Sequence, residues 1–337
     1  MKYVRLDRGL VVGGLALAMA GCGSAPASSS SVKSQTTTVK FSEVIRSVFY
    51  APQYVALAKG FFRQQHLKVN LVTSEGSNIG AAALLSGSAN IALVGPETTI
   101  YIHNQHGTSS LKVFEQLTGT DGSFLLSRHP IRHFSWADLN GQTIIGWRPG
   151  SDPQMVLQTA LVRHGVHANV LTNIAPQAMV GAFESGKAPF IQEYEPVVSS
   201  LIQHKQAYLV TSMAKAAGTY PETSYVATSA YIKSHPKVIQ EWTNAIHQGV
   251  LWTDSHTPQQ VAKMIQSYFS GTSLSSLAAS VSMYQHQNTW PKSPLLTRAE
   301  YRALENTLAV SGVVKRSQDV PYRDVIDTQF AKAALKQ

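Results

Sequence analysis

From Val39 onward, short runs of β-forming residues alternate with segments that carry apolar residues at helical spacing. Eight runs have the length and composition of strands, and they span 39–48, 67–73, 91–94, 111–117, 143–146, 170–173, 190–193 and 208–211. Such alternation is typical of α/β units built on a mostly parallel sheet. It therefore predicts an α/β fold for most of the chain.

Helical signals separate these runs and then dominate the end of the chain. Residues 54–62 carry apolar side chains at i, i+3, i+4, i+7 and i+8, and Gly60 allows the chain to turn near the end of that helix. After about Thr228 strand signals become scarce. Pro236 marks the start of one long helix, and the capping box 257–260 marks the start of another. We expect a helical C-terminal segment.

The first 21 residues have the pattern of an export signal. Three basic residues precede an apolar stretch at 10–20, which is too short to span a bilayer. The small residues just before Cys22 resemble the lipobox of bacterial lipoproteins. We therefore expect a lipoprotein signal peptide at 1–21, a lipidated Cys22 as the first mature residue, and a flexible, Ser- and Thr-rich tether at 22–38.

Composition excludes several classes of site. Cys22 is the one cysteine of the 337 residues, so the chain alone forms no disulfide and no cysteine-rich metal site. The net charge is +9, but the 28 Lys and Arg residues are scattered, which argues against nucleic-acid binding. Histidine pairs such as His103 and His106 lack further ligands, so we expect no metal site. The scarcity of acidic residues would suit an acidic habitat.

Four segments resemble a known family. Residues 46–62 look like the opening of extracytoplasmic solute-binding proteins of ABC importers, in the branch of alkanesulfonate-binding and thiamine-pyrimidine-precursor-binding proteins. Residues 83–92, 95–98 and 138–145 agree with the same family in order and spacing. The resemblance covers about residues 39–245.

This resemblance implies a two-lobed, hinged periplasmic-binding-protein-like fold of type II. Lobe I would comprise 39–127 and 227–337, lobe II would comprise 128–226, and the crossing strands would lie at 123–127 and 223–228. It also implies a non-enzymatic monomer without cofactor, which captures a small molecule and delivers it to an ABC permease. The protein would be extracytoplasmic, anchored to the outer face of the cytoplasmic membrane.

Ligands of open α/β sheets bind beyond the carboxyl ends of strands, so the loops there supply the candidate site. In lobe I these loops contribute aromatic rings for stacking, helix-start groups for an anionic or acceptor group, and a carboxylate for N–H donors. The candidates are Phe49, Tyr50, Gln53, Ser77, Asn78, Glu97 and Thr98. Each also has a structural explanation as core, cap or helix-start residue.

In lobe II and at the second crossing strand, Arg148 could take an acidic group and Tyr194 could stack on a flat ligand. The candidates there are Trp147, Arg148, Ser151, Glu193, Tyr194, Glu195 and Tyr225. Because several carboxylates oppose one arginine, the sequence favours a polar nitrogen heterocycle resembling a thiamine pyrimidine precursor. An alkanesulfonate or related organic anion is the alternative. A precursor-synthase-like enzyme is a further one, but those enzymes carry a cysteine-rich motif that this chain lacks.

Overall fold

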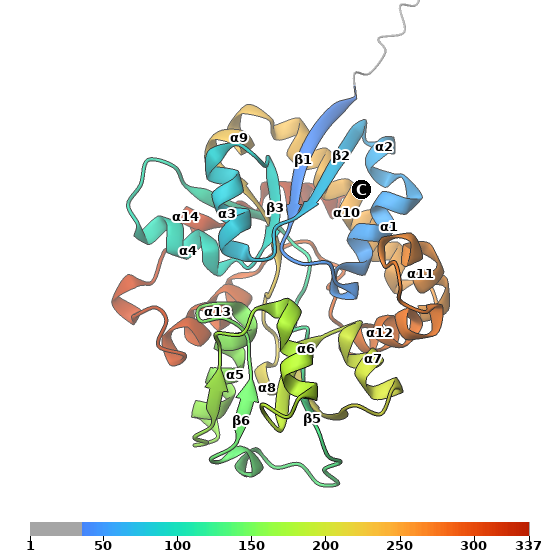
Figure 1. The fold of residues 1–337 in the computed structure, drawn as a ribbon. Helices are drawn as coiled ribbons and strands as arrows, with labels where there is room; N and C mark the ends of the chain where they lie inside the picture. Colours follow the sequence, from blue (N-terminus) through green and yellow to red (C-terminus); the bar gives the residue numbers. More distant parts are fainter. Residues whose placement is uncertain (1–35, 337) are drawn as a thin grey trace, which may run out of the picture. The chain divides into compact units, whose positions relative to one another are not determined.

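A computed structural model describes residues 36–336 (Figure 1). These residues build two five-stranded sheets with the same pattern of strand order. The first sheet has the order β2-β1-β3-β10-β4, and the second has the order β7-β6-β8-β5-β9. The strands are β1 (Thr37–Glu43), β2 (Leu67–Thr73), β3 (Ile91–Val94), β4 (Leu111–Gln116), β5 (Ser123–Ser127), β6 (Thr143–Ile145), β7 (Asn169–Leu171), β8 (Phe190–Tyr194), β9 (Tyr208–Ser212) and β10 (Ser224–Thr228).

In each sheet one antiparallel strand arrives from the other half of the chain. β10 runs antiparallel to β3 and β4 in the first sheet, and β5 runs antiparallel to β8 and β9 in the second. The chain therefore crosses between sheets before Ser123 and again before Ser224. The expected lobe limit at 127/128 lies after β5, which pairs in the second sheet, and the expected limit at 226/227 lies within β10, which pairs in the first.

Helices connect the strands and follow them. The α-helices are α1 (Ala51–Lys59), α2 (Phe61–Gln64), α3 (Ser77–Ser86), α4 (Glu97–Asn104), α5 (Asp152–Arg163), α6 (Pro176–Glu184), α7 (Val197–Gln203), α8 (Met213–Ala217), α9 (Ser229–Ser234), α10 (Pro236–Asp254), α11 (Pro258–Ile265), α12 (Leu274–His286), α13 (Arg298–Val310), α14 (Tyr322–Val325) and α15 (Gln329–Ala334). Short 3-10 turns occur at η1 (Val48–Tyr50), η2 (Trp136–Leu139), η3 (Gln266–Tyr268) and η4 (Arg316–Gln318).

Local signals in the sequence explain several helix ends. Gly60 adopts φ +74°, a left-handed conformation that glycine accepts easily, and the chain turns there as expected, but the helix expected to include residues 61 and 62 ends at Lys59 and α2 begins at Phe61. The capping box of α11 is confirmed, because the Thr257 side chain accepts from the backbone N–H of Gln260 while the Gln260 side chain accepts from that of Thr257. The run expected as a strand at 39–48 is shorter, since β1 ends at Glu43 and η1 follows.

The C-terminal helices pack against helices that accompany each of the two sheets. α10 contacts α1, α2 and α15, whereas α12 contacts α7 and α13 contacts α5, both of which belong to the second half of the fold. Trp242 of α10 is fully buried, and its ring lies 4.8 Å from that of Phe41, 4.7 Å from that of Phe62 and 5.5 Å from that of Tyr225. The helical C-terminal segment therefore supports the first sheet and also reaches across to the second.

The expected signal peptide, Cys22 and nearly all of the expected tether lie outside the described residues. Among the helices that the structure does describe, none has the length and apolarity required to span a membrane.

Replacement of Trp242 by alanine should lower the free energy of unfolding by about 3–5 kcal/mol, because it leaves a cavity among three aromatic rings. Leu251→Ala on the same helix is the control, since Leu251 is 44% exposed and should change stability by roughly 0.5 kcal/mol or less. Urea denaturation followed by circular dichroism measures both. Equal losses in the two variants would contradict this account of the core.

Candidate functional site

A cavity of about 100 Å³ lies where the carboxyl ends of strands from both sheets face one another. The loops after β1, β2, β6 and β7, the end of β8 and the segment before β10 form its walls. This is the place where open α/β sheets bind ligands. Its lining comprises Val44, Ile45, Tyr50, Glu75, Gly76, Ser77, Trp147, Arg148, Ser151, Asp152, Pro153, Pro176, Tyr194, Glu222 and Thr223.

Three aromatic side chains form part of the wall. Tyr50 comes from η1, Trp147 from the loop after β6 and Tyr194 from the end of β8. The Trp147 and Tyr194 rings meet edge to face with centroids 5.2 Å apart, and the Trp147 Nε1 donates to the Gln192 carbonyl at 3.1 Å. These contacts fix the orientation of Trp147, so the aromatic wall is preorganised for a flat or apolar body.

Arg148 is the cationic group of this wall. None of the ion pairs within residues 36–336 involves it. Its guanidinium lies beside Gly76, because a Cβ added at Gly76 would be 3.7 Å from Nε and 3.8 Å from Nη2. Gly76 precedes the first turn of α3, where Ser77 also lines the cavity. An unpaired guanidinium next to a helix N-terminus is suited to an anionic group.

The two buried carboxylates in the wall already have donors from the protein. Glu222 accepts from the Tyr194 hydroxyl and, at 2.6 Å, from the backbone N–H of Gly122. Asp152 accepts from the Tyr220 hydroxyl at 2.6 Å. Burial raises the pKa of Asp152 to about 6. The pKa of Glu222 is also raised, mainly by burial and then by the negative charges of Asp121 and Asp152. Both buried carboxylates of the wall therefore already accept hydrogen bonds from within the protein.

Six of the residues chosen from sequence line this cavity, and they are Tyr50, Ser77, Trp147, Arg148, Ser151 and Tyr194. Three more, Asn78, Glu97 and Thr98, line an adjacent groove of about 470 Å³ between α3, α4 and the loop after β6. Ser77 and Asn78 were expected just before a helix, but α3 already begins at Ser77. Ser77 and Arg148 border both the cavity and the groove.

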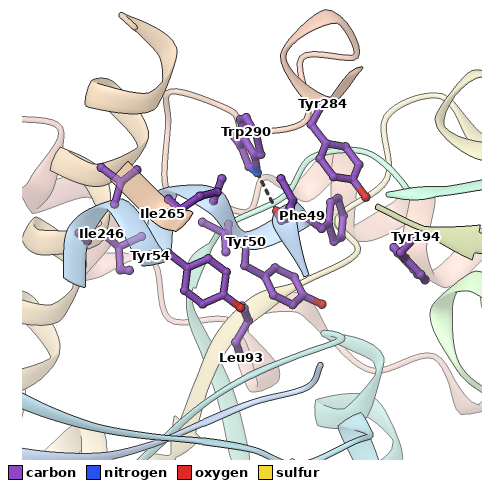
Figure 2. Packing of buried hydrophobic residues seen from close by; sticks show 14 of the residues in the cluster. Phe49, Tyr50, Tyr54, Leu93, Tyr194, Ile246, Ile265, Tyr284 and Trp290 are labelled. Carbon is purple, nitrogen blue, oxygen red and sulfur yellow. Dashed lines mark hydrogen bonds between the residues drawn. The ribbon is translucent and has the colours of Figure 1, made fainter. Parts of the chain in front are cut away.

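Phe49, Gln53 and Tyr225 do not reach the cavity. Phe49 is fully buried among aromatic residues that include Tyr284, 5.2 Å away between ring centroids (Figure 2). The Gln53 side chain donates to Glu43 at 2.8 Å and accepts from the Tyr225 hydroxyl at 3.1 Å. These three side chains therefore serve the core, because packing and a buried hydrogen-bond network occupy them.

Glu193 and Glu195 also lie away from the cavity. Successive residues of a strand point to opposite faces, so Glu193 faces away from the side on which Tyr194 lines the cavity. Burial raises the pKa of Glu193 to about 8. Glu195 accepts from the backbone N–H and the hydroxyl of Ser199 and from the Ser280 hydroxyl, so it holds the start of α7 against α12.

Several lining residues were missed from sequence, above all Asp152 and Glu222. A usable signal existed for Glu222, because an antiparallel crossing strand starts at the edge where its parallel neighbours end. Ser224 indeed pairs with Val94, the last residue of β3. Among the described residues, no group of three or more His, Cys, Asp or Glu side chains could hold a metal ion.

Comparison with known proteins now decides the family. The model of the NMT1/THI5-like family matches residues 49–260. The chain belongs to this family. The Bacillus subtilis (strain 168) protein YtlA, provisionally named a binding protein, is 33% identical over 305 residues, which cover 89% of this chain and 91% of YtlA.

Solved structures show that this NMT1/THI5-like chain has the fold of periplasmic binding proteins. The ligand-binding component of an ABC-type import system from Staphylococcus aureus, with zinc bound, matches with a TM-score of 0.74 at 13% identity, covering 88% of this chain and 99% of that one. The alkanesulfonate-binding protein SsuA from Xanthomonas axonopodis pv. citri, bound to MOPS, matches with a TM-score of 0.68 at 14% identity, covering 87% and 99%. The expected α/β, periplasmic-binding-protein-like fold is confirmed.

Replacement of Tyr194 by phenylalanine should lower the free energy of unfolding by about 1–3 kcal/mol, because buried Glu222 loses a donor. Tyr208→Phe is the control, since Tyr208 is 39% exposed and its hydroxyl is not part of the site. Chemical denaturation at pH 7 compares the two. A loss no larger than that of the control would show that Tyr194 does not stabilise Glu222.

Proposed function

We propose that this protein is the solute-binding component of an ABC import system and captures a small solute that carries an anionic group. The observation that carries the proposal is the arrangement of donors in the cavity. Arg148 is unpaired there and Ser77 stands at the start of α3, whereas Glu222 and Asp152 are already hydrogen-bonded within the protein. The oxygen atoms of an anionic group would accept hydrogen bonds from the Arg148 guanidinium and from the donors at the start of α3.

Capture follows from the way the two sheets share the cavity. Tyr50 and Ser77 come from loops of the first sheet, whereas Arg148 and Tyr194 come from the second. Among the described residues, the strands of the two sheets are linked by chain crossings just before β5 and just before β10. A ligand that contacts both sides stabilises the arrangement in which they meet, so hinged closure holds the solute until delivery to a permease.

The residues that line the cavity favour an organic anion as the ligand, whereas the sequence favoured a nitrogen heterocycle. The heterocycle was favoured because Glu97 and one of Glu193 or Glu195 were expected to receive its N–H groups, yet none of the three lines the cavity. The alkanesulfonate-binding neighbour supports the anion. A thiamine-pyrimidine-precursor-like heterocycle stays the second candidate, because the three aromatic side chains of the wall can stack on a flat ring.

The remaining parts of the proposal concern location. We place the protein outside the cytoplasm, as a monomer tethered to the outer face of the cytoplasmic membrane through lipidated Cys22 and the segment 22–38. Its partners would be the transmembrane subunits of the permease, and the reaction would be binding without covalent chemistry.

A thermal-shift panel of alkanesulfonates, taurine, pyrimidines, thiamine and riboflavin tests the ligand class, because a ligand that binds the native state raises the melting temperature. We expect the anions to stabilise the protein. Arg148→Gln should then weaken binding by about 10- to 100-fold, the equivalent of the roughly 1.5–3 kcal/mol of a hydrogen bond to a charged group. Isothermal calorimetry measures the affinity.

Arg163→Gln is the matched control, since Arg163 is an exposed arginine in the last turn of α5 and should leave affinity unchanged. Stabilisation by pyrimidines alone would reject the anion in favour of the heterocycle. Stabilisation by no member of the panel would leave solute binding without support.

Cys22→Ser should release the protein from the membrane into the soluble extracytoplasmic fraction, because the acyl acceptor is lost. Cell fractionation and immunoblotting compare the variant with wild type and with Ser24→Ala, which keeps the cysteine. Membrane retention of the Cys22→Ser protein would contradict lipid anchoring.

A further inference from the structure

Two buried carboxyl groups, Glu97 and Asp152, meet where the two sheets face each other. Glu97 begins α4 just after β3 of the first sheet, and Asp152 begins α5 just after β6 of the second. Both are almost completely buried, at 1% and 4% exposure. Each carboxyl therefore marks the cavity end of its own sheet, and the contact between them joins the two halves.

Gly95 shows how tightly the two groups fit. A Cβ added at Gly95 would lie 1.9 Å from Asp152 Oδ2 and 2.0 Å from Glu97 Oε2. Since both oxygens lie so near one point, no water molecule fits between them. The absence of a side chain at residue 95 is what allows this contact.

The contact requires a proton. Within the described residues, Glu97 Oε2 has no donor partner, and the oxygen beside it belongs to another carboxyl group. Two ionised carboxylates in contact repel, whereas a carboxyl and a carboxylate form a strong hydrogen bond. One proton shared by the pair therefore turns an unfavourable contact into an attractive one.

The other polar groups around the pair do not remove this need. The Tyr101 hydroxyl donates to the Gly150 carbonyl, and the Tyr220 hydroxyl donates to the other oxygen of Asp152. Arg148 acts on both carboxyl groups by charge alone, and it lowers their pKa values less than burial raises them. Two further acids, Asp121 and Glu222, add negative charge near Asp152.

We propose that Glu97 and Asp152 form a proton-dependent latch between the two sheets, so that solute capture is strong while the pair holds one proton and weakens when that proton is lost. The effect on capture rests on the proposed function. The latch itself is a property of the empty protein, so the two can be tested separately.

The direction of the pH dependence follows from the two carboxyl groups. Burial and then Asp152 raise the pKa of Glu97, and burial raises that of Asp152 to about 6. The pair titrates as a unit, and its last proton leaves above the lower of the two values. The favourable contact is therefore present as long as the pair holds this last proton, and it is lost as the pH rises through the raised pKa of Glu97, above the value of about 6 for Asp152. The added negative charge beside Arg148 also disfavours an anionic solute.

Binding of 1-butanesulfonate between pH 5 and pH 8 tests the effect on capture, because a sulfonate keeps its charge over this range. For wild type, Kd should rise by up to about tenfold per pH unit once the proton is lost, as linkage to one proton requires. Glu97→Gln should flatten this dependence, since its amide donates to Asp152 at every pH. Asp152→Asn removes the other carboxyl group of the pair, so it should also flatten the pH dependence of Kd.

Glu115→Gln is the matched control. Glu115 is 1% exposed and burial raises its pKa, but it lies in β4 away from the cavity. It should keep the wild-type pH dependence. A Glu97→Gln protein that binds and retains the wild-type slope would overturn the latch.

Hydrogen–deuterium exchange of the ligand-free full chain, corrected for the intrinsic effect of pH, tests the latch without any solute. Peptides that span 95–98 and 148–152 should lose protection between pH 5 and pH 8 in wild type and keep it in Glu97→Gln. This result without binding of any solute would reject the proposed function and support the latch. Binding without any pH effect, in either measurement, would reject the latch alone.

Discussion

A buried carboxyl group needs either a donor or a proton, and this requirement shapes the region around the cavity. Eight of the 19 acidic residues of the chain are buried, namely Glu43, Glu97, Glu115, Asp121, Asp152, Glu193, Glu195 and Glu222. No lysine or arginine is buried in the described residues, so most donors are hydroxyl, amide and backbone N–H groups. Glu43, for example, accepts from Gln53, Tyr54 and Thr73, and it forms an ion pair with the partly exposed Arg46. In the described part of the chain, Glu97 Oε2 has no hydrogen-bond donor and lies beside the Asp152 carboxyl group.

The same requirement explains which part of the site could be predicted from the sequence. Strand ends follow from local alternation, and the loops at strand ends that carry Tyr50, Ser77, Arg148 and Tyr194 do line the cavity. Whether an acid at a strand end faces a ligand depends on donors far away in the chain. Glu195 finds its partner Ser280 on α12, 85 residues later, and no local pattern announces this contact.

Sheet membership was harder to predict than strand position. β5 and β10 were both expected close to where they occur. The expected lobe limits place β5 in lobe I although it pairs in the second sheet, and they cut through β10, which pairs wholly in the first. A strand's own residues specify its length and its buried faces. Which strands it pairs with depends on which sheet edges the rest of the chain leaves without a neighbouring strand. Both crossing strands are fully or almost fully buried, so their alternation is too weak to show a preference.

The carboxyl groups that titrate above acidic pH lie mainly in the interior of this protein and not on its surface. Among the residues that the structure describes, the acidic residues outside the core are outnumbered more than two to one by Lys and Arg, which keep their charge across the range in which carboxyl groups titrate. Acidification therefore neutralises few surface carboxylates, and the scarcity of such groups suits an acidic habitat. The buried acids around the cavity titrate at higher pH because burial raises their pKa values. A rise in pH above about 6 therefore acts on the buried acids around the cavity more than on the surface, and the basic surface says little about the solute.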